Sequence, residues 1–207
     1  VRRGASGYGG PMKADGRVFD LPVVAASRWI FTCYGIIGDE GSVVMVDAGL
    51  PSSARGALGA LRSIGRQPKD VTTVLATHGY SDHVGGMSTV LKQTPASALL
   101  PQRCRNYLSG ATPRSFGLDA NVRFLPMLGQ HRFSAAAARE FVQTGTSVGY
   151  GRQEQFTLPF TPSGFLADGD SVPGAPGWMV IATPGHTDDS ISLYHAGSAT
   201  LLSGDGW

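Results

Sequence analysis

The chain has 207 residues, of which 42% are hydrophobic and 15% charged, so it can bury one sizeable core and is not an intrinsically disordered polymer. Its 17 basic and 15 acidic residues are scattered and form no basic stripe that would neutralise a phosphate backbone, so we expect no nucleic-acid partner. At this length we expect one globular domain.

The ends and the cysteines bear on the cellular location. No apolar run approaches the roughly 18 residues of a membrane span, and Val1–Pro11 lacks the apolar core of a signal peptide. We therefore expect a soluble, cytoplasmic protein without a membrane partner. The chain starts at Val1 and stops at Trp207, and we expect the natural chain to continue beyond at least one end. Cys33 and Cys104 have no metal-ligand spacing, which predicts buried thiols.

The first half of the sequence predicts strands and one clear helix. Residues 1–16 are rich in Gly, Arg and Ser and are predicted to form a flexible arm, which leaves residues 17–207 as the domain. Apolar residues over 29–37 and 42–46 predict two paired strands. A helix then runs to about residue 64, because apolar residues recur every three or four positions, and we expect Ser52 or Ser53 to cap it.

Alternating strands and helices continue to the end of the chain. Segment 71–76 is a predicted strand, and a second helix is predicted from Gly85-Gly86 to about Lys92. Residues 109–165 form a predicted insertion, because their pattern weakens to Pro, Gly and Thr turns. Further elements are predicted as strands over 98–100, 178–183, 191–195 and 200–203 and helices over 103–108 and 134–142. This order predicts a layered α/β or α+β fold.

Residues typical of metal ligands are densest in segment 77–83, which has the sequence THGYSDH and follows a buried strand. Residues two apart in an extended loop point to the same side, so His78 and Tyr80 can face one metal while Asp82 and His83 turn toward a neighbouring point. Imidazole and carboxylate are suitable zinc ligands.

Two later segments repeat this arrangement. His186 and Asp205 each follow an apolar strand. Three strand ends are therefore expected to converge on one metal centre.

These motifs resemble those of the metallo-β-lactamase superfamily, whose pattern is THxHxDHxGG, then PGHT, then GD, after a strand that ends in DxG. The resemblance covers about residues 31–205, with Asp47-Ala48-Gly49 as the DxG segment. It implies an α/β fold, a four-layer αββα sandwich incomplete at the C-terminus, with metal at the sheet edge.

The resemblance also implies a ligand set. His78 and His186 would serve the first metal site, Asp82 and His83 the second, and Asp205 would bridge both.

The chain departs from the family pattern at two ligands. Tyr80 replaces the second histidine, and a phenol must lose its proton before it can bind a metal strongly. The family's last histidine would lie beyond Trp207. Asp82, His83 and Asp205 with one water would still form the open site of a catalytic zinc.

We expect a hydrolase that uses metal-activated water on an ester, thioester, lactone or amide bond of a small molecule, with one or two zinc ions. Asp82 would orient the nucleophile, and Tyr80 would donate a hydrogen bond to the developing oxyanion. The alternative is a catalytically impaired relative that binds a ligand or regulates a partner. A third hypothesis is that Tyr80 selects iron. An exposed edge at the strand 200–203 favours a homodimer.

The remaining polar and aromatic residues have more than one interpretation. Asp47 is predicted either to hydrogen-bond to a ligand or to cap the following helix. We expect Asp188 and Asp189 to form a solvated turn, and His131 and His195 to be surface or packing residues. A group of aromatic residues in or beside the insertion would line a substrate pocket or form a satellite core. These are Phe116, Phe124, Phe133, Tyr150, Phe156, Phe160 and Phe165.

Overall fold

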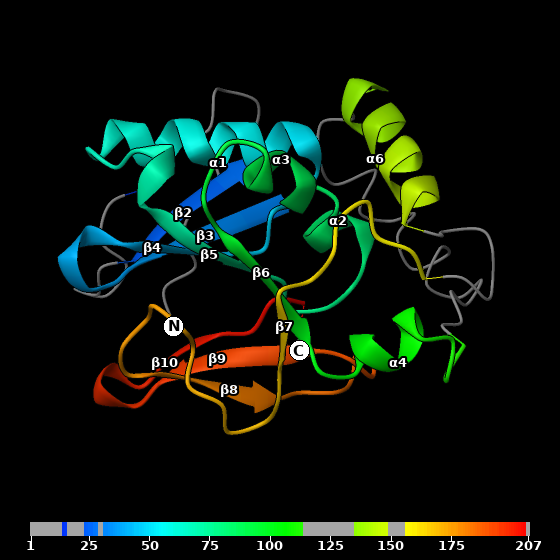
Figure 1. Ribbon diagram of the computed structural model, residues 1–207. Coiled ribbons are helices and arrows are strands. Elements are labelled where there is room, and N and C mark those ends of the chain that lie inside the picture. The colour runs from blue at the N-terminus through cyan, green and yellow to red at the C-terminus, as the bar shows by residue number, and fades with distance from the viewer. Residues whose placement is uncertain (1–13, 16–22, 29–30, 114–134, 149–155, 206–207) are drawn as a thin grey trace.

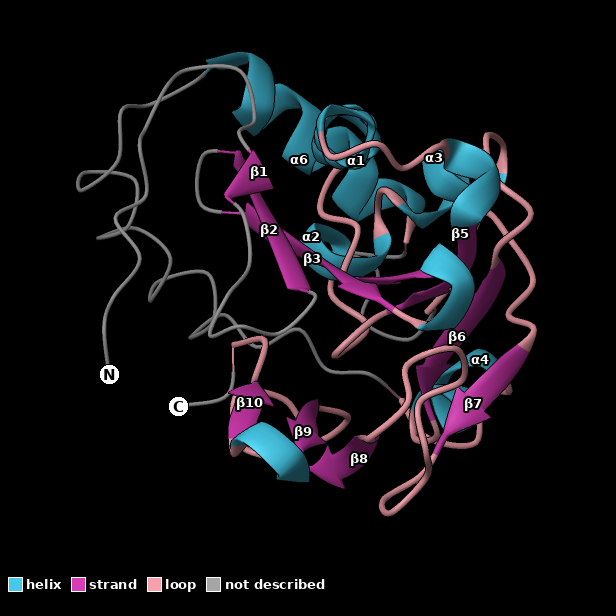
Figure 2. Ribbon diagram, turned by 90° about the vertical axis from the view of Figure 1, so that its left-hand side faces the viewer, coloured by secondary structure: helices cyan, strands magenta, loops and turns pink. Residues whose placement is uncertain are grey.

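The computed structural model describes residues 14–15, 23–28, 31–113, 135–148 and 156–205. They form a seven-stranded sheet with the order β1-β2-β3-β4-β5-β6-β7 and a three-stranded sheet with the order β10-β9-β8. Helices α1 and α3 cover one face of the large sheet, and the small sheet lies against the other face (Figures 1 and 2). This arrangement confirms the predicted α/β class.

The large sheet is antiparallel on one side and parallel on the other. Its strands are β1 (Ala14–Asp15), β2 (Val23–Arg28), β3 (Phe31–Ile37), β4 (Val43–Val46), β5 (Val71–Leu75), β6 (Ser97–Pro101) and β7 (Gly164–Leu166). Pairing is antiparallel from β1 through β4 and parallel from β4 through β7. The parallel strands therefore deliver their carboxyl ends to the same edge, where ligand sites are commonly built.

The small sheet is antiparallel throughout. It consists of β8 (Trp178–Ala182), β9 (Ile191–His195) and β10 (Thr200–Leu202). Its inner face contributes Val180, Leu193 and Leu202 to a core shared with the large sheet. Among the described residues, no helix covers its outer face (Figure 1), so they display three of the four expected layers.

The helices of the described residues are mostly short. They are α1 (Pro51–Ser63), α2 (Ser81–Val84), α3 (Met87–Leu91), α4 (Cys104–Leu108) and α6 (Ala135–Ser147), with 3₁₀ turns at Asp39–Gly41, Pro68–Asp70 and Ala196–Ser198. None of them has the length and apolar character needed to cross a bilayer.

Strand β4 has an apolar residue at every position because both of its faces are buried. Val43 and Met45 belong to the core beneath α1, whereas Val44 and Val46 belong to the core between the two sheets. A strand that is covered on both faces needs apolar residues at every position.

Several predicted elements are confirmed, and others need correction. The strands predicted over 29–37, 42–46, 71–76, 98–100, 178–183, 191–195 and 200–203 correspond to β3, β4, β5, β6, β8, β9 and β10. Strands β2 and β7 were not predicted. Strand β1 includes Ala14 and Asp15 near the end of the predicted arm, and the remainder of that arm lies outside the described residues.

The predicted cap of α1 is wrong. The helix begins at Pro51 with Leu50 at the N-cap position and no side-chain cap. The backbone N–H of Ser52 donates instead to Glu140 Oε1 at 2.8 Å, and the Ser52 hydroxyl donates to Glu140 Oε2. Glu140 of α6 therefore satisfies the first turn of α1 from a distant part of the chain.

Candidate metal centre

The centre lies where three chain segments leave the two sheets at one edge. After β5 the chain carries His78 and enters α2, which carries Asp82 and His83. The loop between β8 and β9 carries His186, and Asp205 follows β10. Asp82 and His83 thus lie on a helix, where an extended loop was predicted.

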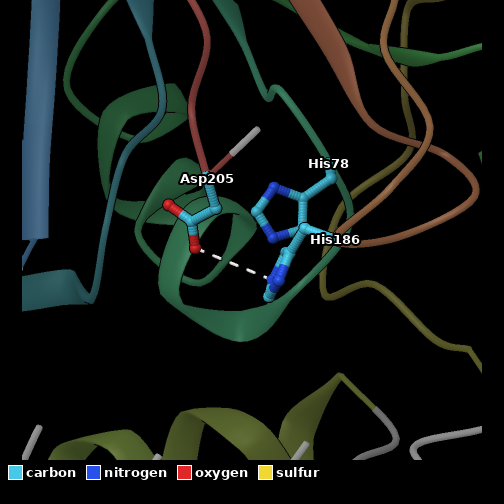
Figure 3. Close-up of side chains that lie close together, drawn as sticks. All are labelled: His78, His186 and Asp205. Atoms are coloured by element: carbon cyan, nitrogen blue, oxygen red, sulfur yellow. Dashed lines mark ion pairs between the residues drawn. The ribbon is translucent and has the colours of Figure 1, made fainter. Parts of the chain in front are cut away.

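All five predicted ligand residues meet at this edge. The potential ligand atoms of His78, His186 and Asp205 lie within 4.8 Å of one another, as do those of His78, Asp82 and His83. Figure 3 shows His186 and His78 facing Asp205. Three imidazoles and two carboxylates form a donor set that suits zinc and related divalent metals, so the residues present fit the metal that the family implies.

The carboxylate of Asp205 lies between the two halves of the cluster. Its Oδ2 is 3.4 Å from His83 Nε2 and 3.7 Å from His186 Nε2, and His83 Nε2 is 3.8 Å from Asp82 Oδ2. One oxygen of Asp205 is therefore within reach of both groups, the position that a bridging ligand would occupy.

The turn before Asp205 requires a glycine. Gly204 has a φ of +54°, in the left-handed region, and a Cβ atom at this position would lie 2.4 Å from Thr77 Oγ1. The GD motif thus lets the segment after β10 pack directly against the segment that carries His78.

Asp47 hydrogen-bonds to residues of the centre without belonging to the ligand group. Its Oδ2 lies 2.9 Å from His83 Nδ1 and accepts the Thr77 hydroxyl at 2.9 Å. Its Oδ1 accepts the Thr77 N–H at 2.8 Å. The Asp47 side chain is buried, with a residue exposure of 2%. Because Nδ1 of His83 is engaged, Nε2 is the nitrogen presented to the centre. Of the two roles considered for Asp47, the structure shows the hydrogen-bonding one.

The charges of the centre are strongly coupled. Burial lowers the pKa of His83, but the carboxylates of Asp47 and Asp82 outweigh it and raise this pKa well above its usual value. Burial raises the pKa of Asp205, but the hydrogen bond and charge of His83 outweigh it, and the pKa lies below its usual value. For Asp82, burial prevails and raises the pKa. The carboxylates that favour positive charge on the His83 imidazole would also favour a metal cation at the same place.

Tyr80 lies at the centre in the place of the missing histidine. Its ring centroid is 5.1 Å from that of His78 and 5.4 Å from that of His186, with edge-on geometry in both cases. Tyr80 also lines an open cavity of about 250 Å³ beside the centre, together with Tyr107, Pro113, Gly185, His186, Thr187 and Asp188. This cavity gives the centre an adjoining polar space.

The prediction of a solvated turn is wrong for Asp189. Asp189 is buried, with an exposure of 2%; its Oδ2 accepts the Gly79 N–H at 2.8 Å and lies 3.2 Å from Cys104 Sγ. The half-exposed Asp188 forms an ion pair with Arg103 at 2.9 Å and accepts the Tyr107 hydroxyl. In the sequence, only the adjacent acidic pair Asp188-Asp189 after the PGHT motif indicates that such contacts could form.

The other candidate residues lie elsewhere. His195 Nδ1 is 2.8 Å from Ser198 Oγ in the turn after β9, which is a packing role. Phe156 belongs to the core between α1 and the large sheet, and Phe160 and Phe165 pack against that core, so these three do not line the cavity. His131 and the remaining four aromatic residues lie outside the described residues. Cys33 and Cys104 are buried free thiols, as predicted.

Comparison with known proteins places these features in a family. A sequence model of the metallo-beta-lactamase superfamily matches residues 29–206. The chain is 28% identical over 171 residues to the probable metallo-hydrolase YflN of Bacillus subtilis, across 79% of this chain and 55% of that protein. It is 28% identical over 165 residues to metallo-beta-lactamase domain-containing protein 1 of Xenopus laevis, across 78% of this chain and 48% of that protein. The chain spans about half the length of these curated relatives.

Solved structures share the layered architecture. The FEZ-1 metallo-beta-lactamase from Legionella gormanii superposes with a TM-score of 0.61 at 14% identity, over 92% of this chain and 60% of that chain. The class B3 di-zinc metallo-beta-lactamase LRA-12 from an Alaskan soil metagenome gives a TM-score of 0.56 at 20% identity, over 85% and 55% of the two chains. These likenesses confirm the fold that the motifs predicted. Because the family model matches residues 29–206 of the 207 and solved members share the fold, the chain belongs to the metallo-beta-lactamase superfamily.

Proposed function

We propose that this protein is a metal-dependent hydrolase that cleaves an ester, thioester, lactone or amide bond of a small molecule. The observation that carries the proposal is the convergence of His78, Asp82, His83, His186 and Asp205 from three chain segments on one small volume. The relatives named as probable metallo-hydrolases support the same class of reaction.

We propose zinc as the metal, as one or two ions. His78, His186 and Asp205 would hold one ion, and Asp82 and His83 would hold the other with Asp205 between them. The di-zinc description of the LRA-12 enzyme supports this choice. When bound, zinc makes water acidic enough to supply a hydroxide nucleophile near neutral pH.

Two side chains of the centre would act on the reacting groups. Asp82 would orient the attacking water by accepting one of its hydrogen bonds. Tyr80, whose ring lies beside those of His78 and His186, would donate its hydroxyl proton in a hydrogen bond to the carbonyl oxygen as negative charge develops there. A donor placed in this way stabilises the transition state more than the ground state.

The cavity beside His186 would hold the rest of the substrate. Its lining includes the polar residues Tyr80, Tyr107 and Asp188. The charge of Asp188 is balanced by Arg103 at 2.9 Å. A neutral substrate with hydrogen-bonding groups is therefore a better match than a strongly charged one.

The test is a hydrolysis assay against p-nitrophenyl esters, thioesters, γ-lactones and amides, with protein as purified, after chelation and after reloading with zinc. We expect hydrolysis of at least one class, loss of activity on chelation, recovery with zinc and a large loss in Asp82→Ala. Full zinc loading without hydrolysis of any class would instead support the non-catalytic ligand-binding relative. Iron, rather than zinc, in protein grown with both metals would support the iron hypothesis for Tyr80.

A further inference from the structure

The buried carboxylate of Asp189 connects the loop that carries His186 to the segment that carries His78. Its Oδ2 accepts the backbone N–H of Gly79 at 2.8 Å and the thiol of Cys104 at 3.2 Å. Gly79 directly follows His78, so the hydrogen-bonded N–H belongs to the peptide plane that joins the two residues. Holding this plane restricts rotation about the Cα–C bond of His78 and so constrains the backbone from which its side chain projects.

The loop that supplies Asp189 is itself held by several hydrogen bonds. The Thr187 and Ser190 hydroxyls are 2.6 Å apart, and the Gly185 N–H donates to the Thr187 carbonyl oxygen at 3.1 Å. The N–H of Ile191 donates to the Thr77 carbonyl oxygen at 2.8 Å. Asp189 thus lies in a turn that is stabilised by hydrogen bonds. Its carboxylate therefore holds Gly79 at a defined position relative to that turn.

Asp189 does not belong to either group of potential metal ligands, and its partners explain why a buried carboxylate is present. A carboxylate that accepts a backbone N–H forms a stronger hydrogen bond than a neutral acceptor. Its neighbour Asp188 makes a different set of contacts, with Arg103 and Tyr107 at the cavity.

We propose that Asp189 is a positioning residue that sets the distance and orientation between His78 and His186 in the metal centre. This inference rests on the proposed function, because it concerns the same metal. It predicts that loss of the Asp189 carboxylate weakens metal binding although no metal ligand is removed.

The experiment compares Asp189→Ala, Asp189→Ser and Asp189→Asn with wild type. The matched control is Asp70→Ala, which removes a carboxylate that accepts the Gln67 N–H at 2.7 Å before β5, at the opposite end of that strand from His78. Zinc affinity is measured by chelator competition, the geometry of the centre by the visible spectrum of the cobalt-loaded protein, and folding by urea unfolding of the metal-free protein.

We expect Asp189→Ala and Asp189→Ser to lower zinc affinity by about 10- to 100-fold and to change the cobalt spectrum. Asp189→Asn should recover most of this loss, because its amide oxygen can accept the Gly79 N–H. Asp70→Ala should keep the wild-type affinity and spectrum even where it lowers stability. Asp189→Ser keeps a polar group at the buried position and tests the inference if Asp189→Ala fails to fold.

Two results would overturn the inference while leaving the proposed function intact. One is a zinc affinity and a cobalt spectrum equal to those of wild type in both Asp189→Ala and Asp189→Ser. The other is an equal loss of zinc affinity in Asp70→Ala, which would indicate a general effect of reduced stability. Failure of the wild-type protein to bind zinc or cobalt would overturn the proposed function and the inference together, and the two failures are thereby distinguishable.

Discussion

The Nδ1 atom of His83 lies 2.9 Å from Asp47 Oδ2, which leaves Nε2 facing Asp205 Oδ2 at 3.4 Å. Asp47 adopts a left-handed φ of 59°, a conformation that asparagine tolerates better than most residues. We therefore expect Asp47→Asn to keep the fold but to lower zinc affinity by about 10- to 100-fold, because the neutral amide orients and polarises His83 less well. Chelator competition measures the change, with the exposed Asp39→Asn as control. Unchanged affinity would show that Asp47 is only structural.

Removal of the Tyr80 hydroxyl tests the proposed oxyanion donor. Tyr80→Phe keeps the aromatic ring that packs against His78 and His186. Zinc content should stay at the wild-type level, whereas kcat should fall by about 100-fold or more, as for loss of a hydrogen-bond donor to an oxyanion. A fall in zinc content instead of kcat would show that the hydroxyl is a metal ligand.

Replacement of Tyr80 by histidine restores the family's ligand pattern. The Tyr80 ring already lies beside both imidazoles that would share the first site, at 5.1 and 5.4 Å between ring centroids. We expect Tyr80→His to raise zinc affinity at that site, measured as tighter binding or a larger zinc-to-protein ratio in elemental analysis. A histidine variant that binds no more zinc than wild type, and no more tightly, would contradict this prediction.

Two glycines give a matched pair of stability predictions. Gly204→Ala places a Cβ atom 2.4 Å from Thr77 Oγ1 at a φ of +54°, and we expect it to destabilise the fold by about 1–3 kcal/mol and to weaken metal binding. Gly59, in the interior of α1, has no neighbour within 4 Å of an added Cβ, so Gly59→Ala should stabilise the protein by about 0.5–1 kcal/mol. Urea unfolding of the metal-free proteins measures both effects, and the opposite order would contradict the packing described.

The thiol of Cys33 should be unreactive in the folded protein. Burial, reinforced by the negative charge of Asp47, raises the pKa of Cys33, and only the thiolate reacts quickly with thiol reagents. Cys104 is also buried. We expect both thiols to react with Ellman's reagent at pH 8 only after unfolding in urea. Rapid reaction of either thiol under native conditions would show that its core opens readily.

The ligand residues could be predicted because each lies in a short motif next to an apolar strand. The sequence motifs around His83, His186 and Asp205 keep their order and spacing, so the resemblance identifies them without knowledge of the fold. Asp189 could not be assigned in this way. Its partners Gly79 and Cys104 are 110 and 85 positions away, and local patterns carry no information about contacts of that range.

The errors in the fold have a similar origin. Ser52 is a residue type that commonly caps helices. Its backbone N–H and its hydroxyl instead donate to the carboxylate of Glu140, which is 88 positions away. Strand β7 has only three residues, Gly164–Leu166, which is too short to show a periodic pattern. It is part of the sheet because β6 supplies its hydrogen-bonding partner. In both cases contacts with distant parts of the chain, and not the local sequence pattern, determine the structure.

The most direct test of the central claim is the zinc content of wild-type, His83→Ala and Asp205→Ala proteins after equilibration with zinc and removal of the excess. The convergence of these side chains predicts about one or two zinc ions per wild-type chain and a clear reduction in both variants, because Asp205 reaches His83 and His186 at 3.4 and 3.7 Å. Wild-type protein without bound zinc, or variants with undiminished zinc, would contradict the claim that these loops form one metal centre.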